Sequence, residues 1–121
     1  MKVKSHLNVN NLPDDESRHP NLSPNTVYTV IGIDNDHFRV VNDSFEPVLY
    51  PKTIFDVLDN NIPSEWVRLD FDDGEYFIDP PEFAEIGFFE SYFDGEDKAV
   101  TIYEMFLKNN GIKIPPEIQD E

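Results

Sequence analysis

Carboxylates are the residues of this chain that are dense enough to do chemistry, and they concentrate between Asp70 and Asp97. Between Leu69 and Asp97 there is no lysine, arginine or histidine. A salt-bridged face would mix both signs of charge, so this one-sided acidic run favours a surface for a cationic partner over a plain solvated face. The eleven acidic residues of the run are Asp70, Asp72, Asp73, Glu75, Asp79, Glu82, Glu85, Glu90, Asp94, Glu96 and Asp97.

A calcium loop does not fit these carboxylates. Such a loop needs oxygen ligands at alternating positions, a glycine at the sixth position and a glutamate at the twelfth. Counting from Asp70, Gly74 falls at the fifth position and Glu75 at the sixth. We therefore predict no metal site and no cofactor.

An enzyme is not favoured by the remaining motifs. A pair of carboxylates can serve a hydrolase, but with 25 acidic residues some pair will look suitable by chance. The chain has no Gly-x-Ser-x-Gly elbow, no P-loop and no dinucleotide fingerprint, and its three histidines lack metal-ligand spacing. We predict no catalytic residues, and a hydrolase remains the least favoured alternative.

The net charge restricts the class of partner. Nine basic against 25 acidic residues give a net charge of −16 at pH 7, which repels nucleic-acid phosphates and anionic lipid. We expect a basic protein as partner, with no direct nucleic acid and no membrane. The chain has no cysteine and no apolar segment long enough to span a membrane, which favours a cytoplasmic protein.

The order of elements predicts a single α+β domain over residues 1–121. Residues 1–25 read as an extended polar arm, 26–79 as an antiparallel sheet, 80–110 as short helices and 111–121 as a tail. The β-branched and aromatic content predicts three successive strands, Thr26–Ile33, His37–Asn42 and Glu46–Tyr50, which form a meander. Lys52–Asp59 reads as a strand or a helical turn. Gly32, inside the first strand, indicates a bulge or a close backbone approach.

A hairpin is predicted around Asp73-Gly74, which matches a two-residue type I′ turn. This turn pairs Phe71 with Tyr76 and Leu69 with Ile78. The predicted core face then carries Val67, Leu69, Phe71, Tyr76 and Ile78, and the opposite face carries Trp66, Asp70, Asp72, Glu75 and Phe77.

Three helical segments are predicted after Pro80-Pro81. They are a turn at Pro81–Glu85, a turn at Phe88–Phe93 and a helix over Lys98–Asn110 with Asp97 as N-cap and Gly111 as its stop. The apolar stripe of the last helix is Ala99, Ile102, Tyr103, Phe106 and Leu107.

Partner-binding residues are predicted from the acidic run and from two aromatic side chains that could anchor a partner. Trp66 is the sole tryptophan and is also a candidate core residue. The predicted set is Trp66, Asp70, Asp72, Asp73, Glu75, Glu90, Tyr92, Asp94, Glu96 and Asp97.

The pattern of turns and aromatic residues over residues 26–95 resembles small bacterial immunity proteins of contact-dependent growth inhibition and polymorphic toxin systems. The segments that carry the resemblance are Tyr28-x-Val30-Ile31-Gly32-Ile33, Phe38-Arg39-Val40-Val41-Asn42-Asp43, Glu46-Pro47-Val48-Leu49-Tyr50-Pro51, Phe55-Asp56-Val57-Leu58-Asp59, Trp66-Val67, Gly74-Glu75-Tyr76, Pro80-Pro81-Glu82 and Gly87-Phe88-Phe89-Glu90-Ser91-Tyr92-Phe93-Asp94-Gly95.

This resemblance implies an SH3-like, partly open barrel or meander with C-terminal helices, and a monomer that forms a 1:1 complex with the C-terminal domain of a cognate toxin. Many such toxins are basic nucleases, whose active site or substrate groove an acidic inhibitor can cover. The alternative from a different class is a phage or plasmid nucleic-acid mimic that inhibits host DNA-binding proteins through the same acidity.

Overall fold

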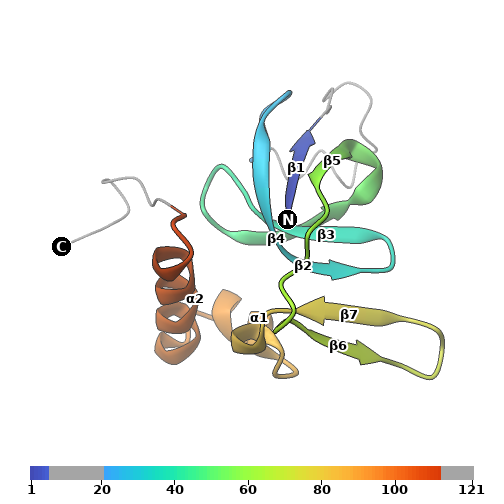
Figure 1. Cartoon of the computed structure of the whole chain (residues 1–121). Helices are drawn as coiled ribbons and strands as arrows, with labels where there is room; N and C mark the ends of the chain where they lie inside the picture. The colour runs from blue at the N-terminus through green and yellow to red at the C-terminus, as the bar shows by residue number, and fades with distance from the viewer. Residues whose placement is uncertain (6–20, 113–121) are drawn as a thin grey trace. The chain divides into compact units, whose positions relative to one another are not determined.

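The computed structural model describes residues 1–5 and 21–112 (Figure 1). Within it the chain divides into two compact units, Met1–Asp79 and Pro80–Glu121. Most of the predicted polar arm, residues 6–20, and the tail from residue 113 lie outside the described residues.

The first unit is an antiparallel sheet in which β2 is the most connected strand. The strand order is β4-β3-β2-β1-β5, and β7 pairs with both β2 and β6. Within the described residues the sheet is not closed into a barrel, because β4 pairs with β3 alone and β5 with β1 alone. The elements are β1 (Lys2–Ser5), β2 (Val27–Asp34), β3 (His37–Val41), β4 (Pro47–Pro51), the 3-10 turn η3 (Lys52–Ile54), β5 (Phe55–Asp59), β6 (Val67–Asp70) and β7 (Tyr76–Asp79).

The predicted meander of β2, β3 and β4 is confirmed. The segment Lys52–Asp59 contains both of the predicted structures, since the 3-10 turn η3 comes first and β5 follows it.

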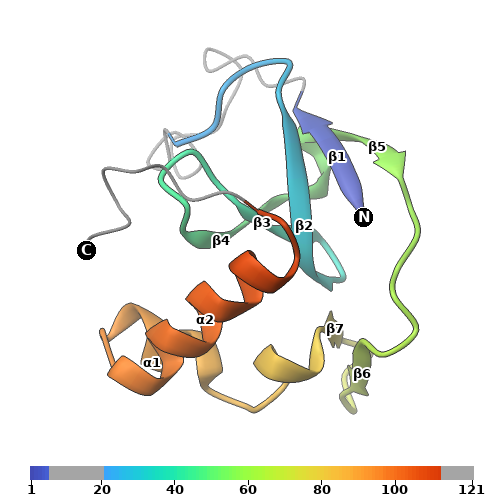
Figure 2. The same ribbon diagram turned by 60° about the vertical axis from the view of Figure 1, so that its left-hand side comes forward.

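Strand β1 was not predicted, and the polar-arm assignment does not hold for Lys2–Ser5. This strand lies between β2 and β5 (Figure 2), and the side chains of Val3 and Ser5 are fully buried. Ser5 Oγ donates a hydrogen bond to the Ser23 carbonyl and accepts one from Thr26 N at 3.1 Å. A four-residue strand with a single buried apolar side chain has too little periodicity to recognise in the sequence.

Gly32 forms the bulge that the sequence suggested as one alternative, and the atoms that approach it closely belong to side chains, not to the backbone. The register of β2 against β3 shifts between Val30 and Gly32, which marks a bulge. A Cβ atom at Gly32 would lie 2.7 Å from Asp79 Oδ1 and 3.3 Å from Arg39 Cβ. The missing side chain therefore leaves room for the side chains of Asp79 and Arg39.

The core of this unit lies between the inward-facing side chains of β1 to β5. Phe55 packs edge-on against Phe38 and Tyr50, with ring centroids 6.1 and 6.5 Å apart. Trp66, Tyr76 and Ile78 of the hairpin segment pack against this cluster. The buried cluster is Val3, Leu22, Tyr28, Val30, Ile33, Phe38, Val40, Tyr50 and Phe55.

The β6–β7 hairpin exists, but its predicted register is wrong by one residue. Leu69 lies opposite Phe77, and Asp70 lies opposite Tyr76. Gly74 N donates to the Phe71 carbonyl at 3.1 Å, and Phe71 N donates to the Glu75 carbonyl at 2.8 Å. Only Gly74 has positive φ in this loop, at 87°. These features define a three-residue loop with a type I turn and a glycine bulge, not a type I′ turn.

A one-residue shift moves side chains to the opposite face of a sheet. Tyr76 and Ile78 face the core as predicted, but Trp66 joins them there. Phe71 and Phe77 lie together on the other face, with ring centroids 5.6 Å apart. The predicted core positions on β6 are thus wrong: Val67 and Leu69 share the outer face with Phe71, which is 42% exposed.

The turn type can be tested with a proline at Asp72. This residue is the second position of the type I turn, which accepts proline, whereas a type I′ hairpin would need its N–H in the strand ladder. We expect Asp72→Pro to leave the free energy of unfolding unchanged or to raise it by up to about 1 kcal/mol. Urea unfolding measures this, and a loss above about 2 kcal/mol would contradict the three-residue loop.

The second unit contains the 3-10 turn η4 (Pro81–Phe83), α1 (Phe88–Phe93) and α2 (Asp97–Asn109). All three predicted helical segments are confirmed. The predicted N-cap is shifted, because Glu96 precedes the first turn without a side-chain cap bond and Asp97 is already helical. Gly111 ends α2 as predicted, with a positive φ of 73°. The next residue, Ile112, donates a backbone hydrogen bond to the Leu107 carbonyl at 2.9 Å, as in other helices that end at a glycine.

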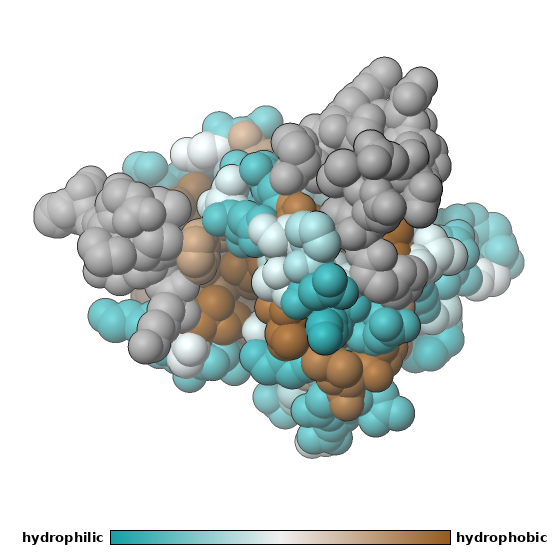
Figure 3. All heavy atoms as spheres, turned by 90° about the horizontal axis from the view of Figure 1, so that it is seen from above, coloured by the Kyte–Doolittle hydropathy of each residue, from teal (hydrophilic) through white to brown (hydrophobic). Residues whose placement is uncertain are grey.

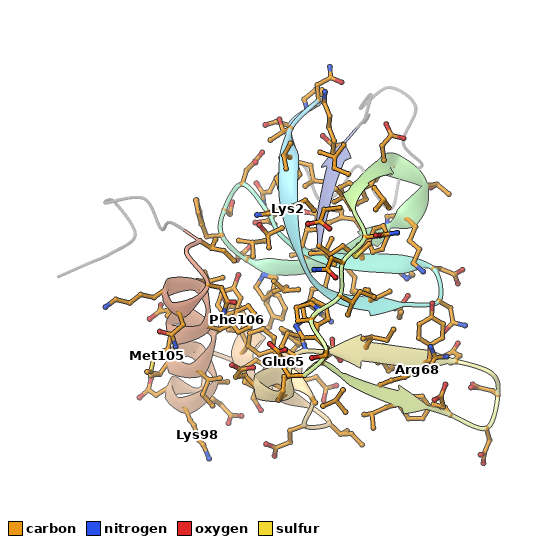
Figure 4. The ribbon with its side chains drawn as sticks, in the orientation of Figure 1. Lys2, Glu65, Arg68, Lys98, Met105 and Phe106 are labelled. Carbon is orange, nitrogen blue, oxygen red and sulfur yellow. The ribbon has the colours of Figure 1, made fainter. Side chains whose placement is uncertain are left out.

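Aromatic side chains hold the second unit together. The ring of Phe83 lies 4.6 Å from Phe106, 5.0 Å from Phe88 and 6.0 Å from Tyr103, centroid to centroid. Phe83 is 2% exposed. Figure 4 shows Phe106 and the exposed Met105 on opposite sides of α2, as the apolar stripe requires. Phe83 therefore joins η4 to both helices.

Truncation of Phe83 should unfold this unit preferentially. We expect Phe83→Ala to lower its free energy of unfolding by about 3 to 5 kcal/mol, because it leaves a cavity among the rings. Phe93→Ala, at a position that is 52% exposed, is the matched control and should cost far less. Amide hydrogen exchange in α2 measures both variants, and equal losses would show that Phe83 is not the central contact.

Candidate functional site: the acidic hairpin and helical segment

Ten of the eleven carboxylates between Asp70 and Asp97 are exposed, and only Asp79 is half-buried. Of these ten, Asp70 alone forms an ion pair with a basic side chain in the described chain, to Arg68. The structure assigns Asp70, Asp72, Asp73 and Glu75 to the hairpin of the first unit, and Glu90, Asp94, Glu96 and Asp97 to the second unit. The predicted partner-binding set is therefore divided between two units.

Asn35 fixes the tip of the hairpin. Its Nδ2 atom donates to the Gly74 carbonyl at 3.2 Å, and its Oδ1 atom accepts from Tyr76 N at 2.9 Å. Asn35 itself lies in the turn between β2 and β3. That turn forms around Asp34, whose Oδ1 atom accepts from Asp36 N at 2.9 Å. The contact across about forty residues could not be read from local sequence.

An open hollow of about 350 Å³ lies at this hairpin tip. Phe71 and Phe77 form an edge-to-face pair with an interplanar angle of 85°. The remaining lining residues are Asp72, Asp73 and Glu75, so no basic side chain contributes to it. The exposed aromatic surface here is surrounded by carboxylates.

The cations near the hairpin gather at Tyr76, on its core-facing side. The guanidinium carbon of Arg68 lies 4.3 Å from the centroid of the Tyr76 ring, and Lys52 Nζ lies 5.9 Å from it. Arg68 Nε also donates to both carboxylate oxygens of Asp70, at 3.0 and 3.2 Å. Figure 4 labels Arg68 on this hairpin. The two faces of one hairpin thus differ in charge.

The acidic residues of the second unit surround the two helices. Glu90 is in the first turn of α1, and Asp94 follows its last residue. Glu96 and Asp97 lie at the start of α2, where negative charge interacts favourably with the helix dipole. Figure 2 shows α1 and α2 side by side in this unit. Glu96 and Asp97 thus have a structural use at the start of α2, and their predicted role in partner binding stays a prediction.

The two predicted aromatic anchors take part in packing. Trp66 is half-buried against the core of the first unit. The Tyr92 ring lies 4.8 Å from that of Tyr103 and 4.9 Å from that of Phe93. The sequence placed Phe77 on the outer face as the structure does, but the two-residue turn placed Phe71 in the core, so the pairing of the two rings was missed.

Asp79, at the end of β7, is the acidic residue of the run whose pKa is shifted by burial. Burial raises the pKa of its carboxyl group to about 6, Arg39 opposes the rise and Asp34 adds to it. Between pH 4 and pH 6 the folded chain therefore holds a proton that the unfolded chain releases, and stability falls as the pH rises through this window.

Asp79→Asn should remove the fall in stability between pH 4 and pH 6. We expect the variant to be more stable than the parent chain at pH 7 and to differ little from it near pH 4, since the amide carries no charge to bury. Urea unfolding at both pH values measures the difference. The exposed Asp36→Asn is the matched control for net charge, and an equal gain at pH 7 in that control would contradict the assignment.

The described residues hold no group of three histidine, cysteine or acidic side chains arranged to bind a metal ion. None of the helices in residues 1–5 and 21–112 is long and apolar enough to cross a membrane. On the face drawn in Figure 3, apolar patches lie between hydrophilic side chains.

Comparison with family models, curated proteins and solved structures found no match to this chain.

Proposed function

We propose that this chain is an immunity protein that binds and neutralises a cognate toxin domain through its acidic surface. The observation that carries the proposal is the exposure of ten carboxylates in one stretch of sequence with a single ion pair to a basic side chain in the described chain. Like charges held together repel one another, and a basic partner would relieve that repulsion. The sequence resemblance to immunity proteins supplies the kind of partner.

In this proposal the partner is a toxin's C-terminal domain with a basic surface, such as a nuclease, and the complex contains one copy of each chain. The acidic surface covers the active site or the groove that receives nucleic acid. The resemblance also leads us to propose an SH3-like relationship for the open sheet of the first unit. The chain acts by stoichiometric binding and performs no reaction of its own.

Co-expression with the toxin domain encoded immediately upstream tests the proposal. We expect growth to be rescued and a complex to be purified. If there is neither rescue nor a complex, the chain is not that toxin's inhibitor. Binding to several unrelated basic proteins would instead favour the nucleic-acid mimic.

Charge reversal tests whether the acidic run makes the contact. We expect reversal of Asp70, Asp72 and Glu75 to lysine to slow association by at least about tenfold at low salt, with a smaller difference at high salt. Reversal of three exposed acidic residues outside the run, Asp36, Glu65 and Glu104, is the matched control.

Stopped-flow mixing measures the association rates, and circular dichroism checks that both variants fold. Equal rates for the two triple variants would contradict a specific role for the acidic hairpin.

A further inference from the structure

The hollow at the hairpin tip combines an exposed aromatic surface with a group of carboxylates of like charge. Phe71 exposes 42% of its surface, and its ring meets Phe77 edge to face. Around these rings stand three exposed carboxylates, Asp72, Asp73 and Glu75. Water solvates the carboxylates well but contacts the aromatic surface at a cost.

A long cationic side chain satisfies both features. Its aliphatic stem packs on the rings while its charged end meets the carboxylates and the ring faces. A neutral apolar side chain would desolvate the carboxylates without pairing them, and an anionic one would be repelled. Charge complementarity therefore selects the occupant of this surface.

The hairpin itself shows how a guanidinium is held by such groups. On the core-facing side, Arg68 stacks on the Tyr76 ring at 4.3 Å and pairs with Asp70 through Nε at 3.0 and 3.2 Å. The outer face offers the same combination of ring and carboxylate, but none of the hollow's lining residues is an arginine. Arginine suits this combination better than lysine, because its planar group stacks on rings and bonds carboxylates with two N–H groups.

We propose that the hollow formed by Phe71, Phe77 and the surrounding carboxylates binds an arginine side chain of the basic partner. Asn35 prepares the site, since its two hydrogen bonds to Gly74 and Tyr76 hold the loop in place before binding. The inference rests on the proposed function for the identity of the partner. The arginine specificity can be measured without that partner.

A tetra-arginine peptide and a tetra-lysine peptide are the probes, and NMR titration of the whole chain is the measurement. We expect chemical-shift changes concentrated at residues 71–77 and a dissociation constant at least about threefold lower for the arginine peptide. Phe71→Leu keeps an apolar side chain but removes the ring, so it should abolish the preference for arginine.

A second variant tests the carboxylates with a matched control. Asp72→Asn with Glu75→Gln should weaken binding of the arginine peptide more than Asp36→Asn with Glu104→Gln, which removes the same charge elsewhere. Shift changes spread evenly over the acidic residues, or equal affinities for the two peptides, would overturn the arginine site.

The two proposals fail separately. Loss of arginine selectivity overturns the hollow and leaves a toxin inhibitor that binds through other contacts. Failure of growth rescue overturns the toxin as partner, whereas the peptide titration still reports on the hollow.

Discussion

The short ladder between β7 and β2 is the constraint on which the hairpin surface depends. It pairs Ile33 with Ile78 and Asp34 with Phe77. Because Ile33 and Ile78 both contact the core, Phe77 must face the other way. Gly32 leaves room beside this ladder for the Asp79 carboxylate, since a Cβ atom at Gly32 would lie 2.7 Å from Asp79 Oδ1. The outward position of the Phe71 and Phe77 pair follows from these contacts.

This register also separates charge across one hairpin. The core-facing side gives Tyr76 two cationic neighbours, Arg68 and Lys52. On the outer side, carboxylates lie around the exposed ring of Phe71 and the half-buried ring of Phe77, and no basic residue lines the hollow. The repulsion among these carboxylates is a standing electrostatic cost that a cationic partner can reduce. The fold thus places several of the chain's acidic residues together on the outer face of the hairpin.

Local pattern was enough to predict β2, β3, β4 and the helices, because each has a clear periodicity or a clear stop signal. It could not reveal β1, whose partners β2 and β5 lie more than twenty residues away. The predicted hairpin register was wrong for a related reason. Both the type I′ turn and the type I turn with a glycine bulge place Gly74 at positive φ, and the pairing of β7 with β2 decides between them. Exposure of the charged residues was predictable from their type, but the aromatic hollow was not, because it depends on that register.

The register of the β6–β7 hairpin is the central claim, and nuclear Overhauser effects between backbone protons across the two strands measure it most directly. The structure predicts Hα–Hα cross-peaks that connect Asp70 with Tyr76 and Arg68 with Ile78. Cross-peaks connecting Phe71 with Tyr76 and Leu69 with Ile78 would instead restore the two-residue turn. That result would return Phe71 to the core side and remove the hollow.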